Sequence, residues 1–379
     1  MGPLHGVTIV EIGSIGPGPF CGMMLSDLGA NVVRVERPDP QPYPELLHRG
    51  RSSIAVDLKH PEAAGLILRL VEQSDGLIEG FRPGVAERLG IGPEACLDRN
   101  AQLVYGRMTG FGQEGPLATV AGHDIDYIAL SGALHPIGLA GGPPVVPLNL
   151  LGDFGGGGML LAVGMLAGLL EAARSGQGQV IDAAMVDGSA LLTTFVHSML
   201  SAGLWSQHRG DNLLDGGAPF YGTYETSDGK YVAVGALEPK FFGVLLDRLG
   251  LDADSVPNQY DRSQWPRIRE LFQRTFAKRT RAEWAGVFEN ADACVAPVLS
   301  LDEAPTHPHN RARRTFVEVE GRVQPAPAPR FSRTAVGIPG PVPKPGQDTD
   351  DVLESFGFRS EEIDALRAAQ VVFCRRRKP

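Results

Sequence analysis

The sequence predicts an α/β protein in which a large domain with a Rossmann-like parallel sheet is joined to a smaller α+β domain. The chain has 379 residues, which is more than one ordinary core needs, so two domains are expected. Strand-like and helix-like segments alternate through the first half, as they do in parallel sheets with helical crossovers. After Asn212 the pattern changes to two alternating strands joined by a tight turn, which marks a second domain.

The first domain is expected to span residues 1–190. Its strands are predicted at residues 7–12, 31–36, 76–79, 103–108 and 179–185. Its helices are predicted at 20–28, 61–73 and 155–173, and a proline at the start of the second favours a helix there.

A linker at 191–215 is expected to lead to the small domain at 216–310. Residues 220–235 predict a hairpin that turns at Ser227-Asp-Gly229. The capping-box pattern Thr280-Arg-Ala-Glu283 predicts a helix at 282–289, and Ser300 to Glu303 predicts another.

Residues 311–379 are predicted to return to the large domain. The proline-rich runs 324–330 and 339–346 favour extended connectors, and a last helix is expected at 360–369. The basic cluster 375–378 is interpreted as a solvated tail.

Composition indicates a small-molecule partner. A net charge of -9 disfavours general nucleic-acid binding. The four cysteines are scattered without metal spacing, so we expect no metal and a reducing, cytoplasmic location. We expect no membrane span either, because the apolar run after Gly158 is short and rich in small residues.

The glycines at 13, 16 and 18 superficially suggest a dinucleotide site. Their order is wrong for the pyrophosphate fingerprint, and Pro17 and Pro19 interrupt them. We therefore expect no nicotinamide or flavin. The loop nevertheless brings the backbone close to a neighbouring group. The tail of a ligand is a reasonable candidate for that group.

Two potential proton carriers, His123 and Asp153, form the most informative pattern. Asp153 lies just before four glycines and an apolar segment, so it is expected at the start of a buried helix, where the helix dipole favours a carboxylate. A simple N-cap is the alternative for Asp153. The pattern predicts acid–base work on a bound small molecule.

Several blocks together resemble the class III coenzyme A transferase superfamily over nearly the whole chain. They are GPGP (16–19), DLGA (27–30), VRVERP (33–38), DLK (57–59), RPG (82–84) and LLDGGAPFY (213–221). Four more blocks are similar to the α-methylacyl-CoA racemase branch: GHD (122–124), NLLGD (149–153), VGALEP (234–239) and DACVAP (292–297). The resemblance implies an acyl-CoA substrate and an interlocked homodimer.

The resemblance also implies roles for the site residues. His123 and Asp153 would exchange the α-proton on opposite faces of the α-carbon, through an enolate, and Glu238 would orient the histidine. Asn149 and Tyr224 would hydrogen-bond around Asp153, and backbone N–H groups near Gly152–Gly156 would hold the enolate oxygen. Asp124 is either a secondary site residue or a helix cap.

Coenzyme A is part of such a substrate, so no separate cofactor is expected. Its phosphates need cations, and four suitable ones follow predicted strands or helices of the first domain: Arg37, Lys59, Arg82 and Arg88. Gly16 and Pro17 are expected along the pantetheine path.

Two alternatives stay open. In the transferases of this superfamily, position 123 is typically aromatic and the carboxylate at 153 is a nucleophile, so a transferase using Asp153 is the main alternative. A non-catalytic acyl-CoA-binding protein is the other. The sequence does not identify the acyl chain.

Overall fold

The computed structural model describes residues 2–39, 45–337 and 340–373. The chain divides into two compact units. Unit 1 comprises Met1–Ser131, Leu148–Leu192 and His309–Pro379, and unit 2 comprises Gly132–Pro147 and Thr193–Pro308. Residues 132–147 thus belong to unit 2, although the sequence analysis placed them in the large domain. The expected linker 191–215 also lies almost entirely in unit 2.

Unit 1 contains the predicted Rossmann-like sheet, in the order β12-β3-β2-β1-β4-β5-β6. Its strands are Thr8–Ile12 (β1), Asn31–Glu36 (β2), Ser52–Val56 (β3), Gly76–Glu79 (β4), Val104–Thr109 (β5), Gln179–Ala184 (β6) and Val372–Phe373 (β12). Neighbouring strands are parallel, except that β12 is antiparallel to β3. Because the chain leaves β1 for β2 on one side and later returns to β4 on the other, the carboxyl ends of β1 and β4 form a topological switch point.

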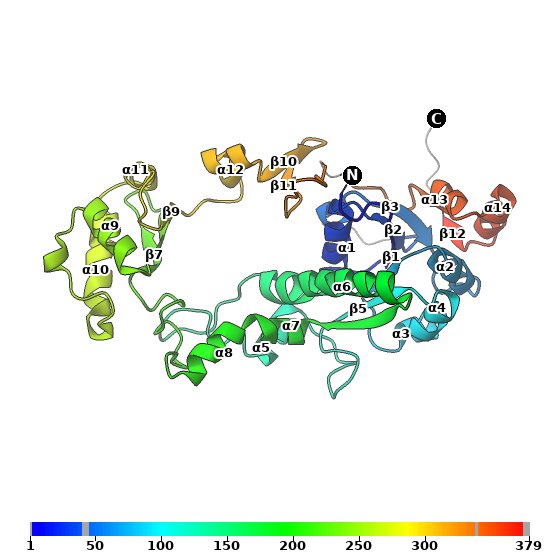
Figure 1. The fold of residues 1–379 in the computed structure, drawn as a ribbon, viewed down its shortest axis with the longest axis horizontal. Coiled ribbons are helices and arrows are strands. Elements are labelled where there is room, and N and C mark those ends of the chain that lie inside the picture. The colour runs from blue at the N-terminus through cyan, green and yellow to red at the C-terminus, as the bar shows by residue number, and fades with distance from the viewer. Residues whose placement is uncertain (1, 40–44, 338–339, 374–379) are drawn as a thin grey trace. The chain divides into compact units, whose positions relative to one another are not determined.

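Helices cover both faces of this sheet (Figure 1). One face packs against Ala63–Val71 (α2), Pro93–Arg99 (α4), Thr349–Ser355 (α13) and Ser360–Ala368 (α14). The other packs against Pro17–Asp27 (α1) and Leu160–Ser175 (α6). Unit 1 also contains Glu45–His48 (η1), Val85–Arg88 (α3), Asp124–Leu130 (α5), Leu150–Met159 (η2), Met185–Leu192 (α7), and the antiparallel pair Phe316–Val319 (β10) and Arg322–Pro325 (β11). The short helix Pro308–Arg313 (α12) lies at the boundary between the units.

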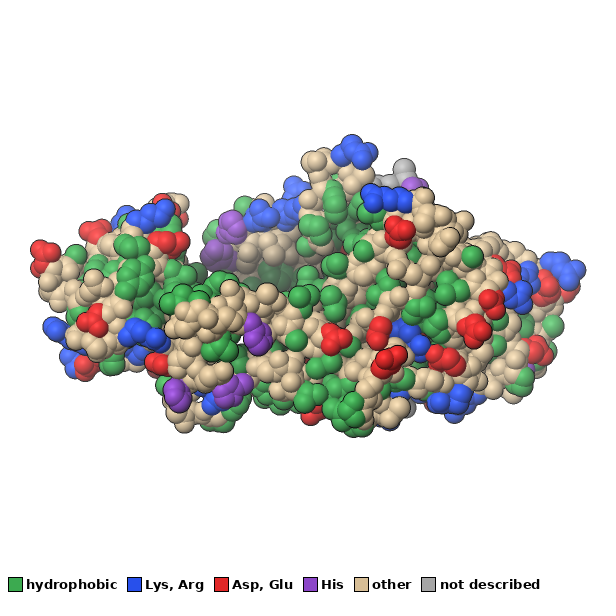
Figure 2. Space-filling model, turned by 60° about the horizontal axis from the view of Figure 1, so that its bottom comes forward, with side chains coloured by type: hydrophobic (Ala, Val, Ile, Leu, Met, Phe, Trp, Pro, Cys, Tyr) green, Lys and Arg blue, Asp and Glu red, His purple; other side chains and the backbone are tan. Residues whose placement is uncertain are grey.

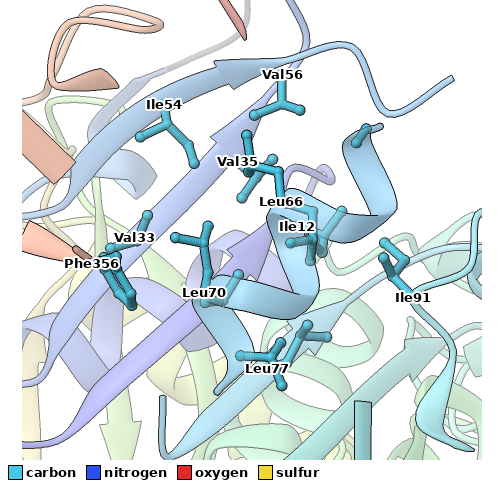
Figure 3. Packing of buried hydrophobic residues seen from close by; sticks show 14 of the residues in the cluster. Ile12, Val33, Val35, Ile54, Val56, Leu66, Leu70, Leu77, Ile91 and Phe356 are labelled. Carbon is cyan, nitrogen blue, oxygen red and sulfur yellow. The ribbon is translucent and has the colours of Figure 1, made fainter. Parts of the chain in front are cut away.

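The core on the α2 face is built from apolar strand residues that alternate with those of the opposite face. Figure 3 shows Leu66 and Leu70 of α2 among Val33, Val35 and Leu77 of the sheet. Phe356, which follows α13, joins the same cluster. Burial on both faces explains why the strands carry apolar residues on either side, with Glu11, Arg34 and Glu36 as buried charged exceptions.

The α1 face carries a buried ionic network at the carboxyl end of β1. Glu11 is fully buried and forms ion pairs with Arg34 of β2 and with Arg51, whose Nη1 lies 2.6 Å from a Glu11 oxygen. Arg34 also pairs with Glu36 at 3.1 Å and donates to the carbonyl of Ser14 at 3.1 Å. The network therefore joins β1 and β2 to the loop that precedes α1.

The C-terminal segment returns to unit 1, as predicted. Arg49 pairs with Asp27 and donates to the side chain of Gln324 and the carbonyl of Pro325, at 2.9 and 2.7 Å. The N–H of Ser53 donates to Asp348 at 2.9 Å. The predicted last helix is present as α14. Pro339 and the basic cluster 375–378 lie outside the described residues.

Unit 2 combines a three-stranded antiparallel sheet with helices. The sheet has the order β7-β8-β9, and its strands are Tyr221–Glu225 (β7), Tyr231–Gly235 (β8) and Val295–Pro297 (β9). The helices are Thr194–Ser201 (α8), Pro239–Leu249 (α9), Trp265–Phe276 (α10) and Arg281–Val287 (α11), with short turns at Ala253–Ser255 (η3), Arg262–Gln264 (η4) and Ala304–Thr306 (η5). The predicted hairpin and the Thr280–Glu283 capping box are confirmed.

The helix expected at Ser300 to Glu303 does not form. The Glu303 carboxylate accepts from the Ser300 N–H at 3.0 Å, as in a capping box, but it also pairs with Arg281 at 2.5 Å and Lys230 at 3.2 Å. The single turn η5 follows. Because Arg281 and Lys230 bind the Glu303 carboxylate, the spacing of Ser300 and Glu303 reflects a tertiary contact and not the start of a helix.

The helix that carries Asp153 is longer than expected. Residues 150–175 form one helical stretch of 26 residues, η2 followed by α6, which by length and composition alone is apolar enough to cross a membrane. The sequence analysis judged the run after Gly158 too short because it missed the first turns. Leu161 and Met165 of this stretch are fully buried in the core of unit 1.

The buried carboxylate of Glu11 yields a stability prediction. In Glu11→Gln, Arg34 and Arg51 lose their shared anion, so the free energy of unfolding should fall by about 3–5 kcal/mol. Urea unfolding followed by circular dichroism measures this. As a matched control, Glu72→Gln breaks an exposed pair with Arg99 and should cost less than about 1 kcal/mol. Equal effects of the two changes would contradict the assignment.

Candidate active site

A cavity of about 560 Å³ lies in unit 1 at the switch point of the sheet. Its lining comes from the segments that follow β1, β4 and β5, together with the starts of α5, α7 and η2. Both predicted proton carriers, His123 and Asp153, line it, as do Gly16, Pro17 and Arg82. The sequence therefore correctly predicted that these five residues come together.

Asp153 lies in the first turn of η2, a π-helical stretch whose N-cap residue is Asn149. It is therefore not an N-cap. Its side chain is partly buried and accepts a hydrogen bond from the Asn149 amide at 3.0 Å, as the resemblance implied. Burial raises the pKa of Asp153, and the charge of Asp124 adds to the rise, while the Asn149 hydrogen bond and His123 oppose it. A raised pKa makes this carboxylate a stronger proton acceptor.

The glycines after Asp153 allow three helices to pack closely. A Cβ atom on Gly158 would lie 2.7 Å from the carbonyl oxygen of Pro17 in α1, and one on Gly156 would lie 2.6 Å from the backbone nitrogen of Ser189 in α7. Gly16 has a φ of 67°, and a Cβ there would lie 3.3 Å from an Asp153 oxygen. The run is therefore required by packing around Asp153, which a helix cap alone does not explain.

His123 is the exposed N-cap residue of α5. Its backbone N–H donates to the Asp126 carboxylate at 2.9 Å, which fixes the start of the helix. The ring of Tyr127 packs below it, against Phe111 and close to Gly122, and its hydroxyl donates to the Gly122 carbonyl. The histidine is thus held at the mouth of the cavity by a rigid helix start.

Asp124 proves to be more than a helix cap. It is the first residue of α5 and is 6% exposed, and its Oδ1 accepts the backbone N–H of Asp153 at 2.6 Å. The N–H of Asp153 is therefore already bonded and is not among the donors near Gly152–Gly156 that are free to hold the enolate oxygen.

Two expected site residues lie in unit 2. Glu238 is exposed and is the N-cap residue of α9, three residues beyond the end of β8. Tyr224 is 1% exposed, stacks on Phe276 and donates its hydroxyl to the carbonyl of Pro219. This corrects the role expected for Tyr224, because its hydroxyl is already bonded within the core of unit 2 and is not available to Asp153.

The four predicted cations lie at the carboxyl edge of the sheet. Arg37 follows β2, Lys59 follows β3, Arg82 follows β4, and Arg88 ends α3. All four are exposed, and none forms an ion pair with another described residue. Only Arg82 lines the cavity itself.

The sequence analysis missed several lining residues. They are mainly apolar or aromatic and include Ile15, Phe81, Phe111, Tyr127 and Met185. Most of them follow the end of a strand. Their position directly after a predicted strand is the signal that would have found them. Among residues 2–39, 45–337 and 340–373, no group of three His, Cys, Asp or Glu side chains is placed to hold a metal.

Comparison with known proteins places this fold and site in a family. The sequence model described as CoA-transferase family III matches residues 4–349. The chain is 48% identical to a Mus musculus protein named alpha-methylacyl-CoA racemase and 46% identical to its Homo sapiens namesake, each over 97% of both chains. A crystal structure of a CAIB/BAIF family protein from Brucella suis matches with a TM-score of 0.81 and 25% identity, covering 94% of this chain and 99% of that one. The chain belongs to CoA-transferase family III.

Proposed function

We propose that this protein racemises 2-methyl-branched acyl-CoA thioesters by proton transfer at the α-carbon. The observation that carries the proposal is that His123 and Asp153 line one cavity at the switch point of the sheet. The racemase name of the relatives at 46–48% identity supports the same reaction. An isomerisation of this kind needs no cofactor beyond the coenzyme A of the substrate.

Inversion at the α-carbon requires a base on one face and an acid on the other. One carrier removes the α-proton, the electron pair of the C–H bond moves into the thioester as an enolate, and the second carrier protonates the opposite face. Neutral His123 with protonated Asp153 serves one enantiomer, and imidazolium with carboxylate serves the other. Burial raises the pKa of Asp153, which strengthens it as a proton acceptor from the α-carbon.

The developing enolate charge needs electrostatic stabilisation. Asp153 lies in the first turn of η2, where the positive end of the helix dipole faces the cavity. The N–H of Asp153 is bonded to Asp124. The enolate oxygen would therefore be stabilised by this dipole and by the other N–H groups in the first turns of the helices.

Arg82 is the cation best placed for the coenzyme A phosphates, because it lines the cavity. We propose that Arg37, Lys59 and Arg88 extend this positive edge toward the nucleotide, and that Gly16 and Pro17 flank the pantetheine. A local cluster of this kind explains how a protein with a net charge of -9 binds an anionic ligand.

We propose that the protein is a homodimer. An apolar stripe runs along α6 through Met159, Val163, Leu166 and Leu170, and three of these side chains are 49–63% exposed. Apolar side chains are also exposed on the face drawn in Figure 2. Contiguous exposed apolar residues are typical of protein interfaces. In an interlocked dimer, Glu238 would reach His123 from the other chain. The cytoplasm is proposed as its location, on the free thiols Cys21, Cys96 and Cys294.

The first prediction concerns proton exchange. In deuterated water, a single-enantiomer 2-methylacyl-CoA should take up α-deuterium and lose chirality. His123→Ala and Asp153→Ala should each slow this at least ~100-fold, because each removes one acid–base group. His5→Ala and Asp98→Ala alter exposed residues of unit 1 and serve as matched controls.

Another outcome would replace the proposal. If the α-hydrogen does not exchange and CoA passes to an added free acid in an Asp153-dependent way, the protein is a transferase. Binding of the thioester with neither reaction would indicate a non-catalytic acyl-CoA-binding protein.

The second prediction concerns Arg82. Arg82→Gln should raise KM about tenfold while kcat changes less than threefold, because phosphate contacts bind ground state and transition state alike. Steady-state kinetics with Arg99→Gln as the exposed control measures this. A large fall in kcat at unchanged KM would place Arg82 at the reacting centre.

The third prediction concerns the dimer. Light scattering should give twice the mass of one chain, and Val163→Glu should shift the protein toward monomer because it places a charge in the apolar stripe. Val145→Glu changes another exposed valine, in unit 2, and is the control. A parent protein that is monomeric at micromolar concentration would refute the dimer.

A further inference from the structure

The Asp124 carboxylate is unusually placed for a side chain at the start of a helix. It is 6% exposed, and only Oδ1 has a hydrogen-bond partner among the described residues, the backbone N–H of Asp153. Burying a carboxylate with one oxygen unsatisfied is unfavourable. Simple capping of α5 does not require this arrangement, because Asp126 already accepts the N–H of the N-cap residue His123.

The surrounding backbone is shaped to admit this carboxylate. A Cβ atom on Gly152 would lie 2.6 Å from Oδ1 of Asp124, so the approach requires glycine at the position before Asp153. Asp124 is the first residue of α5, and the group it binds is in the first turn of η2. Two helix N-termini therefore meet at one negative charge, which both dipoles favour.

We propose that Asp124 is a positioning residue that ties the start of η2 to the start of α5 and so fixes the spacing between His123 and Asp153. The tie is short, because Asp124 directly follows His123 and its partner is the N–H of Asp153 itself. The inference rests on the proposed function for the roles of those two carriers.

The charge of Asp124 has a second effect. Burial is the main cause of the raised pKa of Asp153, and the negative charge of Asp124 raises it further. The other groups near Asp153 are Asn149 and His123, which oppose the rise, and Tyr127 of α5. Asp187 of α7, the helix packed against η2, is exposed. Asp124 thus raises the proton affinity of Asp153, in addition to holding its backbone.

Two substitutions separate these effects. Asp124→Asn keeps an oxygen acceptor and removes the charge, whereas Asp124→Ala removes both. Glu94→Gln, which changes an exposed first-turn carboxylate of α4, is the matched control. If Asp124→Ala fails to fold, Asp124→Asn alone still decides the charge effect.

Two measurements do not depend on turnover. The pKa of Asp153, followed by its carbon-13 carboxyl resonance and assigned with Asp153→Asn, should fall in Asp124→Asn. Amide hydrogen exchange at Asp153 should become at least ~10-fold faster in Asp124→Ala and stay near the parent rate in Asp124→Asn, because a lost hydrogen bond of about 1.5–3 kcal/mol changes the opening equilibrium by that factor or more.

Kinetics provides the third measurement. The limb of the pH profile of kcat/KM that reports Asp153 should move to lower pH in Asp124→Asn, because removing a negative charge lowers the proton affinity of Asp153. Asp124→Ala should lower kcat more than ~10-fold with little change in KM, and Asp124→Asn should recover most of this loss.

The outcomes distinguish the two proposals. If the parent protein does not exchange the α-hydrogen, the proposed function fails, and the carboxyl titration and amide exchange still decide the role of Asp124. If Asp153 titrates at the same pH in the parent and in Asp124→Asn, and its amide exchange is unchanged in Asp124→Ala, the inference is overturned.

Discussion

The buried carboxylate of Glu11 is the constraint on which the geometry of unit 1 depends. Placed between Arg34 and Arg51 with no exposure to solvent, it must be satisfied by both cations, because an unpaired buried charge is far costlier than an unmade surface pair. Each arginine also donates to a backbone carbonyl. Arg34 donates to the carbonyl of Ser14 and Arg51 to that of Pro19, so the network fixes both ends of the loop that carries Gly16 and Pro17. That loop forms one wall of the cavity beside Asp153.

Close backbone packing connects this fixed loop to Asp153, the proposed proton carrier. Once the first turn of α1 is fixed, η2 can lie against it only with glycines facing Pro17. On the opposite side of η2, α7 packs so closely that a Cβ on Gly188 would lie 1.8 Å from the Gly156 carbonyl oxygen. π-helical stretches are rare and frequent at functional sites, which agrees with the position of Asp153 in η2. Packing this tight partly desolvates the carboxyl group, and burial is the main cause of its raised pKa. Fold stability and acid–base tuning thus share the same contacts.

The sequence predicted those features that have a local signal. Alternation and proline positions predicted β1, β2, β4, β5, β6 and the α6 helix within a few residues, and the blocks around His123 and Asp153 singled out two residues that line one cavity. It did not predict β3, α4, α9, α10 or α13, although the apolar spacing of Trp265, Ile268, Phe272 and Phe276 in α10 is helical. Tyr224 and Glu303 were misassigned for a different reason. Their partners, the Pro219 carbonyl and Arg281, are set by tertiary packing, and no local pattern reveals which contact a tyrosine or a glutamate will make.

The candidate site in unit 1 of a single chain is incomplete for the proposed chemistry. The missing parts are an argument for the proposed dimer. Deprotonating a thioester α-carbon requires that fixed dipoles act in a dry cavity, because water weakens each of them. Asp153 is already partly buried, but His123 is exposed, and both carboxylates in the first turn of α5 are bonded to backbone N–H groups, Asp126 to that of His123 and Asp124 to that of Asp153. A covering surface must therefore supply both exclusion of water and a partner for the imidazole. Glu238, an exposed carboxylate at the start of α9 in unit 2, has the charge and accessibility for that role, and the unpaired apolar stripe of α6 supplies a surface on which a second chain can dock. On this argument, the proposed dimer would complete the active site.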